Sequence, residues 1–197
     1  MSDVRLEPLG GNVADAARTL ARAFVTNPLH VAAFGPDQLA RNEAFFRIGL
    51  SVMKGPKLVA RAGERILGVI HWVQSPACQF SGLEKLRMMP SMIRGFGLPA
   101  ATRVGSWLSA WAREDLRTAH LHLGPIGVDP EAQGRGIGQR LMMAYCEELD
   151  RRGVPGYLET DRPENVAFYR RFGFETTAQI QVLNVPNYLM TRRTPGT

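Results

Sequence analysis

The spacing of apolar residues changes several times along the first part of the chain. Residues 4–9, VRLEPL, form a short apolar run that predicts an opening strand. Apolar residues then recur at helical spacing over 13–24, directly after Asn12, a residue type that caps helices. Residues 26–37, TNPLHVAAFGPD, contain Pro and Gly and predict a loop. Helical spacing returns over 37–53, so we expect a strand followed by two helices.

The middle of the chain combines a hairpin pattern with a less regular segment. Two β-rich runs within 57–73 flank the sequence Ala-Gly-Glu-Arg, which predicts an antiparallel hairpin with a tight turn. Residues 75–119 are rich in Leu, Met and Trp but are interrupted by Pro76, Pro90 and Pro99. We expect this segment to form short helices inserted between strands.

Strand-like and helix-like patterns alternate over the last third of the chain. The predicted strands are 120–128, 156–160 and two runs in the tail after 174, and the predicted helices are 137–153 and 164–173. Gly153 and Gly173 are expected to end these helices. The resulting order, with strands in the majority and helices on the connections, indicates an α/β or α+β fold.

Composition narrows the class of protein. The chain has 197 residues, 45% of them hydrophobic, so we expect one domain over 1–197. Lys and Arg exceed Asp and Glu by 24 to 18, and the net charge of +6 suits an acidic ligand. The basic residues are scattered in doublets such as Arg151–Arg152, without interleaved aromatic residues, so no nucleic-acid partner is expected.

The cysteines and the first residues bear on location. Cys78 and Cys146 have no metal-type spacing, and a disulfide is not expected. The opening sequence MSDVRLEPLG carries charges and no apolar signal segment, and no stretch approaches the roughly 20 apolar residues that cross a bilayer. We therefore expect a soluble, cytoplasmic protein with reduced thiols and no membrane partner.

One glycine-rich stretch carries the first chemical signal. In GVDPEAQGRGIGQRLM, residues 127–142, Gly134, Gly136 and Gly138 lie between an extended apolar run and a predicted helix. Glycine allows positive φ and close approach to the backbone, and the first amides of a helix are free to bind an anion. The stretch therefore predicts a site for phosphate groups, the alternative being a glycine-rich helix entry without a ligand.

Two common nucleotide loops fit this stretch poorly. A dinucleotide-binding loop is suggested by Glu159, about twenty residues further on, but that motif needs a third Gly where Gln139 stands. Five residues separate Val128 from Gly134, whereas a dinucleotide turn follows its strand directly. A P-loop is excluded because no Lys-Ser or Lys-Thr follows the glycines.

The same stretch resembles the acyl-CoA pyrophosphate loop of the GNAT N-acetyltransferase superfamily. That family's pattern, Gln/Arg-x-x-Gly-x-Gly, is matched by Gln133, Gly136 and Gly138. Further on, YLETDRPENVAFYRRFGFE resembles the next strand and helix of the family, including Asn165 and Tyr169. Together with AFVTNPLHVAAFGPD near the start, these motifs most resemble the sequences of the branch that contains puromycin N-acetyltransferase.

The resemblance implies a fold and an activity. The GNAT fold has a mixed, mostly antiparallel central sheet of about seven strands flanked by helices. Here it would have a helical insertion, 75–119, between the third and fourth strands and an acetyl-CoA-binding core over 120–174. The implied activity is acetyl transfer from acetyl-CoA to a primary amine of a small molecule by direct attack on the thioester. The alternatives are a protein or peptide N-acetyltransferase and a non-catalytic acyl-CoA-binding regulatory module, and a homodimer is left open.

The resemblance also assigns the residues that bind acetyl-CoA. Backbone amides of 133–138 would hold the pyrophosphate, and the strand before them would offer backbone groups to the pantetheine arm. Gly124-Pro125 interrupts that strand, and Pro lacks an N–H, so a bulge or splay is expected where the cofactor enters. The full assigned set is Ile126, Gly127, Val128, Gln133, Gly134, Arg135, Gly136, Ile137, Gly138, Asn165 and Phe168.

The catalytic assignments leave alternatives open. Tyr169 matches the family's tyrosine that protonates the CoA thiolate, although a tyrosine on a short helix also serves in packing. Asn165 would bind pantetheine or cap its helix. Glu159 would accept the amine proton, directly or through water, or would be a structural carboxylate. His120 and His122 could also act as a base, but a surface or core role is favoured, and without a third ligand at metal spacing we expect no metal site.

The acceptor is expected to contact the part of the chain outside the matched motifs. Aromatic and Met side chains recur there, and taken together they indicate an apolar or aromatic acceptor, although each one alone is more typical of a core. These residues are Phe45, Phe46, Trp72, Met88, Met89, Trp107 and Trp111, and the stretch AFVTNPLH, 23–30, is expected to contribute as well.

Overall fold

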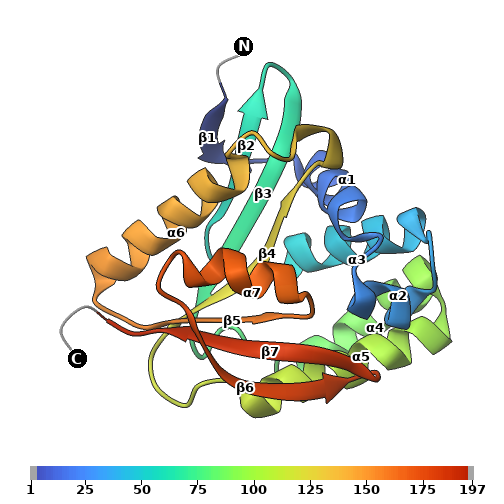
Figure 1. The fold of residues 1–197 in the computed structure, drawn as a ribbon. Helices are drawn as coiled ribbons and strands as arrows, with labels where there is room; N and C mark the ends of the chain where they lie inside the picture. Colours follow the sequence, from blue (N-terminus) through green and yellow to red (C-terminus); the bar gives the residue numbers. More distant parts are fainter. Residues whose placement is uncertain (1–3, 195–197) are drawn as a thin grey trace.

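The computed structural model describes residues 4–194 (Figure 1); the two ends of the predicted single domain, 1–3 and 195–197, lie outside the described residues. The elements in chain order are β1 (Arg5–Pro8), α1 (Val13–Phe24), α2 (Pro28–Phe34), α3 (Leu39–Val52), β2 (Lys57–Ala62), β3 (Arg65–Gln74), α4 (Gly82–Phe96), α5 (Leu98–Glu114), β4 (Leu121–Val128), the short 3-10 helix η1 (Pro130–Ala132), α6 (Ile137–Arg152), β5 (Gly156–Thr160), α7 (Pro163–Arg170), β6 (Glu175–Val182) and β7 (Val185–Arg192).

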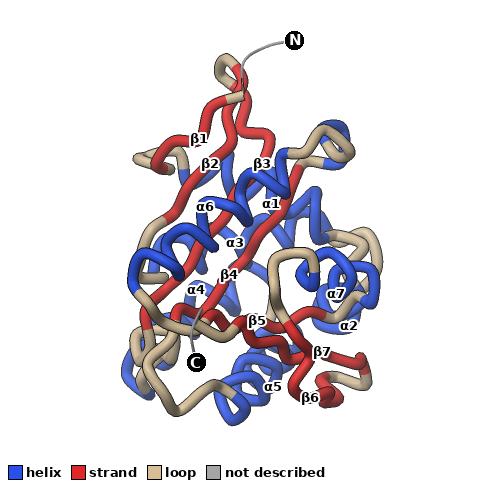
Figure 2. Tube along the Cα trace, turned by 60° about the vertical axis from the view of Figure 1, so that its left-hand side comes forward, coloured by secondary structure: helices blue, strands red, loops and turns tan. Residues whose placement is uncertain are grey.

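One mixed sheet organises the described chain. Its strand order is β1-β2-β3-β4-β5-β7-β6, and β4 and β5 form the parallel pair while the other neighbours are antiparallel. Helix α6 lies on one face of the sheet, and α1 and α3 lie on the other (Figures 1 and 2). The predicted α/β fold with a seven-stranded, mostly antiparallel mixed sheet is therefore confirmed.

Strand β3 shows how the sheet forms its core. Its eight inner residues are all buried, so it forms the continuous apolar run expected of a strand covered on both faces. Ile70 packs into the cluster that includes α6, and Val69 packs into the cluster that includes α1. Burial on both faces helps to fix the register in which β3 pairs with β2. The antiparallel hairpin of β2 and β3 was predicted from the sequence.

The segment 26–37 is not the loop that the sequence predicts, because it contains α2. Pro28 stands in the first turn of the helix, where its missing N–H is tolerated. The Asp161 carboxylate accepts the backbone N–H of Leu29 at 2.7 Å and thereby supplies the N-terminal partner. The helix therefore depends on a residue far away in the sequence. Asn12, in turn, makes no side-chain cap for α1 and donates to the Leu9 carbonyl.

The insertion between β3 and β4 forms two long helices, α4 and α5, instead of the short helices expected from its prolines. Pro90 lies inside α4, and Pro99 lies in the first turn of α5, where a proline fits. Ser81 and Glu84 form a capping box that starts α4. Buried apolar residues of both helices join α2 and α3 in a second core, which stabilises them despite the internal proline.

No helix within 4–194 has the length and the apolar composition needed to span a membrane. Cys78, which is half-buried, and Cys146, which is buried, are both free cysteines.

Candidate active site

Strand β4 separates from β5 soon after the two strands pair. Their parallel register comprises only Leu121 with Gly156 and His122 with Tyr157. The register of β4 with β3 also shifts between Ile70 and Trp72. The predicted splay at Gly124-Pro125 is therefore present, and it leaves the edge of β4 that faces β5 without strand pairing beyond His122.

The glycine loop lies where β4 ends and α6 begins. Gly134 and Gly136 both have φ of +76°, and Gly136 is the left-handed residue that precedes the first helical residue, Ile137. A Cβ added at either glycine would have no neighbour within 4 Å, so both face open space. Ile137 is buried and anchors the helix start, whereas 133–136 are exposed. The loop thus combines free helix amides with an accessible surface.

Charged side chains hold the entrance to this loop. Arg22 of α1 contacts Asp129 at 3.1 Å and Glu131 at 2.8 Å, and Arg65 contacts Glu131 at 3.1 Å. Asp129 also accepts the backbone N–H of Glu131 at 3.0 Å, which starts η1. These contacts attach the segment between β4 and the glycines to α1 and β3.

The side chains of the loop bind their own backbone. Gln133 donates from Nε2 to the Val128 carbonyl at 3.1 Å, and Arg135 donates to the Glu131 carbonyl at 3.0 Å. Gly138 lies in the first turn of α6, where an added Cβ would meet Val128 at 3.7 Å and Phe168 at 3.8 Å. Phe168 therefore lies close to the helix start, although it comes from α7.

A cavity of about 230 Å³ opens beside the splay of β4. Ile126, Glu159, Asn165 and Tyr169 all line it, together with the Gly124-Pro125 backbone. The fold thus brings predicted residues from β4, β5 and α7 to one cavity, while the glycine loop lies outside it, at the other end of the unpaired edge of β4.

Tyr169 and Asn165 extend from α7. Tyr169 is 6% exposed, and burial raises its pKa above the ordinary value, with a further contribution from the charge of Asp161. The hydroxyl therefore keeps its proton at neutral pH. Asn165 is the third residue of α7 and donates to the Thr160 hydroxyl at 3.2 Å, so it does not cap the helix.

Glu159 binds a histidine from the neighbouring strand. Its Oε2 lies 2.9 Å from Nε2 of His122, and its side chain is 2% exposed. The other carboxylate oxygen, Oε1, is buried without a hydrogen-bond partner among the described residues. Burial lowers the pKa of His122, but the charges of Glu159 and Asp115 outweigh it and raise that pKa well above the ordinary value.

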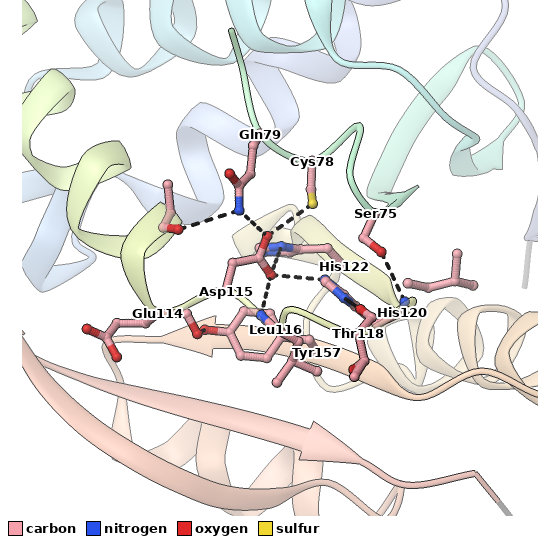
Figure 3. Close-up of polar contacts among 12 residues, drawn as sticks. Ser75, Cys78, Gln79, Glu114, Asp115, Leu116, Thr118, His120, His122 and Tyr157 are labelled. Atoms are coloured by element: carbon pink, nitrogen blue, oxygen red, sulfur yellow. Dashed lines mark hydrogen bonds and ion pairs between the residues drawn. The ribbon is translucent and has the colours of Figure 1, made fainter.

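His120 and His122 belong to a polar cluster that the sequence did not reveal. Cys78 from the β3–α4 loop and Asp115 from the end of α5 lie beside them (Figure 3). Asp115 Oδ1 is 2.9 Å from His120 Nε2 and 3.5 Å from His122 Nδ1, and Cys78 Sγ is 3.1 Å from Asp115 Oδ2. Burial lowers the pKa of His120, but the carboxylate outweighs it, so the pKa rises to about 9.

The opposite wall of the cavity is aromatic. His30 of α2 lies among Phe24, Phe45, Phe46 and Trp107, with ring centroids 5.0 to 5.4 Å away. Its Nδ1 is 2.6 Å from Asn42 Oδ1, and burial lowers its pKa to about 4 even though this contact acts in the opposite direction. His30 is therefore neutral at neutral pH. It ends the stretch 23–30 that was expected to contribute to the acceptor site, although no role was predicted for the histidine itself.

Asp161 connects the two walls and was also missed. Besides the Leu29 N–H, its carboxylate accepts a hydrogen bond from the Asn27 side chain at 2.9 Å. Asp161 directly follows β5 and Thr160, whereas Asn27 precedes α2. This buried contact places the segment before α2 against the end of β5, beside the cavity.

Comparison with known proteins identifies relatives of this arrangement. Residues 33–174 match the family described as acetyltransferase (GNAT). A mycothiol acetyltransferase of Saccharomonospora viridis is 44% identical over 54 residues, which are 26% of this chain and 18% of that protein. The N-alpha-acetyltransferase RimI of Mycobacterium tuberculosis is 48% identical over 52 residues, 25% of this chain and 32% of that protein. The chain thus matches less than a third of the length of either relative.

Solved structures share the fold over the whole chain. A crystal structure from Corynebacterium glutamicum, described as histone acetyltransferase HPA2 and related acetyltransferase, has a TM-score of 0.75 and 22% identity, and the match covers 100% of this chain and 99% of that one. A polyamine N-acetyltransferase of Drosophila melanogaster has a TM-score of 0.64 and 15% identity, with 97% and 100% covered. At these identities the likeness concerns the fold.

Proposed function

The chain belongs to the acetyltransferase (GNAT) family, and from this premise we propose that it transfers an acetyl group from acetyl-CoA to a primary amine of a small molecule. The observation that carries the proposal is the splay of β4. Its unpaired edge has the exposed glycine loop at one end and the cavity with Tyr169 and Glu159 at the other. A long donor with a phosphate end and a reactive end fits such an edge.

The residues of the loop fit the pyrophosphate of acetyl-CoA. A Cβ at Gly134 or Gly136 would enter open space, and the first amides of α6 have no side-chain cap, so this space would suit a phosphate group. Residues 133–138 would hold the phosphates, and Arg135 would exchange its backbone contact for one with a phosphate. Ile126–Val128 would offer backbone groups to the pantetheine arm, and Phe168 and Asn165 would flank it from α7. The acetyl-CoA-binding core in this proposal is 120–174.

The chemistry needs an oxygen-binding amide, an acid and a base. Acetyl-CoA supplies the thioester that the amine attacks. A backbone N–H of the β4 edge would stabilise charge on the carbonyl oxygen. Tyr169, protonated at neutral pH, would give its proton to the departing thiolate. Glu159, with its free Oε1, would accept the proton of the amine directly or through water.

The cavity supports a small acceptor with an apolar or aromatic body. Phe24, Phe45 and Trp107 line it together with Asp115, Glu159 and Asp161, and two lysines, Lys54 and Lys85, line it as well. Aromatic rings and carboxylates together favour a cationic amine attached to an apolar group. The narrower resemblance to the puromycin N-acetyltransferase branch agrees with such an acceptor. The two similar proteins, however, are a mycothiol acetyltransferase and the N-alpha-acetyltransferase RimI.

A second candidate, acetylation of a protein N-terminus, is favoured by the local similarity to RimI. A peptide would have to enter the cavity with its first residue only. The remaining alternative, a module that binds acyl-CoA without turnover, predicts binding but no product.

We propose that the reaction takes place in the cytoplasm.

The test is release of free thiol from acetyl-CoA in the presence of a panel of amines. The panel includes arylalkylamines, aliphatic polyamines and short peptides with free N-termini. The proposal expects turnover with arylalkylamines above the rate without acceptor. Turnover with peptides alone would favour the second candidate, and binding of CoA without turnover of any amine would favour the non-catalytic module.

A further inference from the structure

Four potential metal ligands lie together at the start of β4. One atom from each of Cys78, Asp115, His120 and His122 lies within 4.8 Å of the others. They come from three separate segments: Cys78 from the β3–α4 loop, Asp115 directly after α5, and His120 and His122, one directly before β4 and one within it (Figure 3). Alternation places both imidazoles on one face of the strand, so both rings reach the same point.

The spacing of the donor atoms suits a small tetrahedral ion. Zn²⁺ binds Cys sulfur at about 2.3 Å, and His nitrogen and Asp oxygen at about 2.0–2.2 Å, so neighbouring donors lie about 3.3–3.7 Å apart. The Asp115 oxygens lie 2.9 and 3.5 Å from the two ring nitrogens and 3.1 Å from the Cys78 sulfur. Side-chain rotations would lengthen the two shortest of these distances and shorten the wider separations in the cluster, all of which are within 4.8 Å, to the tetrahedral values.

The two ring nitrogens that face the cluster have no hydrogen-bond partners. His120 Nε2 and His122 Nδ1 are buried, and despite their closeness to Asp115 neither is aligned for a hydrogen bond. The His120 side chain is fully buried. A buried ring nitrogen without a partner is costly unless another group takes its lone pair.

The opposite ring nitrogens have the partners that metal-bound histidines use. His120 Nδ1 is 2.8 Å from the Thr118 carbonyl, and His122 Nε2 is 2.9 Å from the Glu159 carboxylate. When the ring is neutral, each partner accepts the outward N–H and leaves the inward nitrogen free to bind a metal ion. Asp115 is oriented as well, since it accepts hydrogen bonds from the Leu116 backbone at 2.9 Å and from Gln79 at 3.1 Å.

We propose that this cluster is a Zn²⁺ site with four protein ligands, Cys78, Asp115, His120 and His122. Cys78 binds as the thiolate and releases its proton to water, and the charges of thiolate and carboxylate balance the ion. The mixed sulfur, nitrogen and oxygen donor set favours Zn²⁺ over Mg²⁺ or Ca²⁺, which take oxygen ligands. No metal was expected from the sequence, because His120 and His122 lack a third ligand nearby in the chain. The fold supplies two further ligands from distant segments.

Such an ion would connect the helical insertion to the sheet. Cys78 precedes α4 and Asp115 follows α5, so both ends of the insertion would be attached to β4. Ser75, directly after β3, already connects the start of the insertion to the start of β4, since its hydroxyl accepts the His120 backbone N–H at 3.1 Å. The ion would also keep His122 neutral with its Nε2–H directed at Glu159. The site is therefore structural, and it positions a cavity residue through His122.

The experiment measures metal binding by the full chain, with no acetyl donor or acceptor present. Protein stripped with a chelator is incubated with Zn²⁺, passed through a desalting column and analysed for metal by mass spectrometry. Co²⁺ replaces Zn²⁺ in a second series, because its visible absorption reports tetrahedral coordination and thiolate binding. The variants are Cys78→Ser and, as the matched control, Cys146→Ser, which changes a buried cysteine of α6 outside the cluster. Circular dichroism reports whether each variant is folded.

The proposal expects one Zn²⁺ per chain in the wild type and in Cys146→Ser. It also expects a thiolate-to-Co²⁺ band in both that is missing in Cys78→Ser. Affinity in Cys78→Ser and in the second variant, His120→Gln, should fall by more than the roughly 10–100-fold typical for loss of an outer partner. Wild-type protein that is folded and retains no metal would overturn the proposal and leave protons and ion pairs to hold the cluster. Equal Zn²⁺ binding by the two cysteine variants would overturn it as well.

Discussion

The two ends of β4 carry two different kinds of site. At the C-terminal end, the strand leads into the loop 133–138, whose residues are adjacent in sequence, mostly exposed and suited to binding through their backbone. At the N-terminal end, His120 and His122 meet Cys78 and Asp115 in a largely buried cluster of side chains. One strand thus separates an open backbone site from a closed side-chain site.

The difference determines which substitutions each site tolerates. A backbone site tolerates most side-chain changes but is blocked when a glycine gains a Cβ in the path of the ligand. A buried side-chain cluster fails when one partner is removed, because the remaining charges lose their compensation. Substitutions that change one kind of interaction and preserve the other therefore test whether one end of β4 binds through its backbone and the other end depends on side chains.

The largest effect is expected at Gly136. Gly136→Val should weaken CoA binding by roughly 100-fold or more, because the side chain blocks the approach to amides whose charge-assisted hydrogen bonds contribute roughly 1.5–3 kcal/mol each. Calorimetric titration with CoA measures this loss. Gly153→Val is the matched control, since Gly153 ends the same helix with φ of +62° and has no neighbour within 4 Å. Equal losses of affinity in both variants would assign the effect to backbone strain.

The next effect concerns Tyr169, between the two ends. Tyr169→Phe removes one hydroxyl, and if that group protonates the thiolate, kcat should fall by roughly 100-fold with little change in the affinity for acetyl-CoA. Steady-state kinetics with one good acceptor decides this. Tyr145→Phe is the control, because its hydroxyl donates to the Leu121 carbonyl at 2.7 Å in the core, away from the cavity. Unchanged turnover in Tyr169→Phe would leave Tyr169 a packing residue.

His30 shows what burial does to a histidine without charged neighbours. Its pKa of about 4 lies below the ordinary value of about 6.5, so unfolded chains bind the proton more tightly. The contribution of neutral His30 to the free energy of unfolding is complete above pH 6.5 and is lost as the pH falls toward 4. By pH 5 the free energy of unfolding is lower by about 2 kcal/mol. Urea unfolding at several pH values should therefore give a steeper loss for the wild type than for His30→Phe. Parallel curves would contradict the prediction.

The smallest effect is expected at Glu159. Glu159→Gln keeps the size of the side chain and an oxygen acceptor for His122 but cannot take a proton, and water can still accept the proton of the amine. We expect roughly a 10-fold lower kcat rather than a complete loss. Glu164→Gln, at an exposed position in the first turn of α7, is the control. A rate equal to that of the wild type in Glu159→Gln would make Glu159 a structural partner of His122.

Much of the fold could be predicted from the sequence because its signals are local. The glycines before α6, the hairpin of β2 and β3, and the splay at Pro125 each follow from a few adjacent residues. Helix α2 could not be predicted, because its N-terminal partner, Asp161, lies far away in the chain. The length of α4 was underestimated because burial against α2, α3 and α5 outweighs the cost of Pro90.

The cluster at the start of β4 was missed for the same reason. Alternation placed His120 and His122 on one face of a strand, but nothing near them in sequence indicated which residues would face that side. Cys78 and Asp115 flank two helices whose packing returns the chain to the sheet, so their approach depends on tertiary structure. Even the pairing of Glu159 with His122 required knowing that β4 and β5 are neighbours.

The splay between β4 and β5 also sets a conflict between folding and access. Two strand edges that face one another inside a sheet would normally join, and every backbone pair gained would make the protein more resistant to unfolding. Pro125, which lines the cavity in this unpaired stretch, has no N–H to contribute to such a pairing. Variants selected only for thermal resistance would tend to close this opening. At the open edge, stability against unfolding is therefore exchanged for access to the cavity.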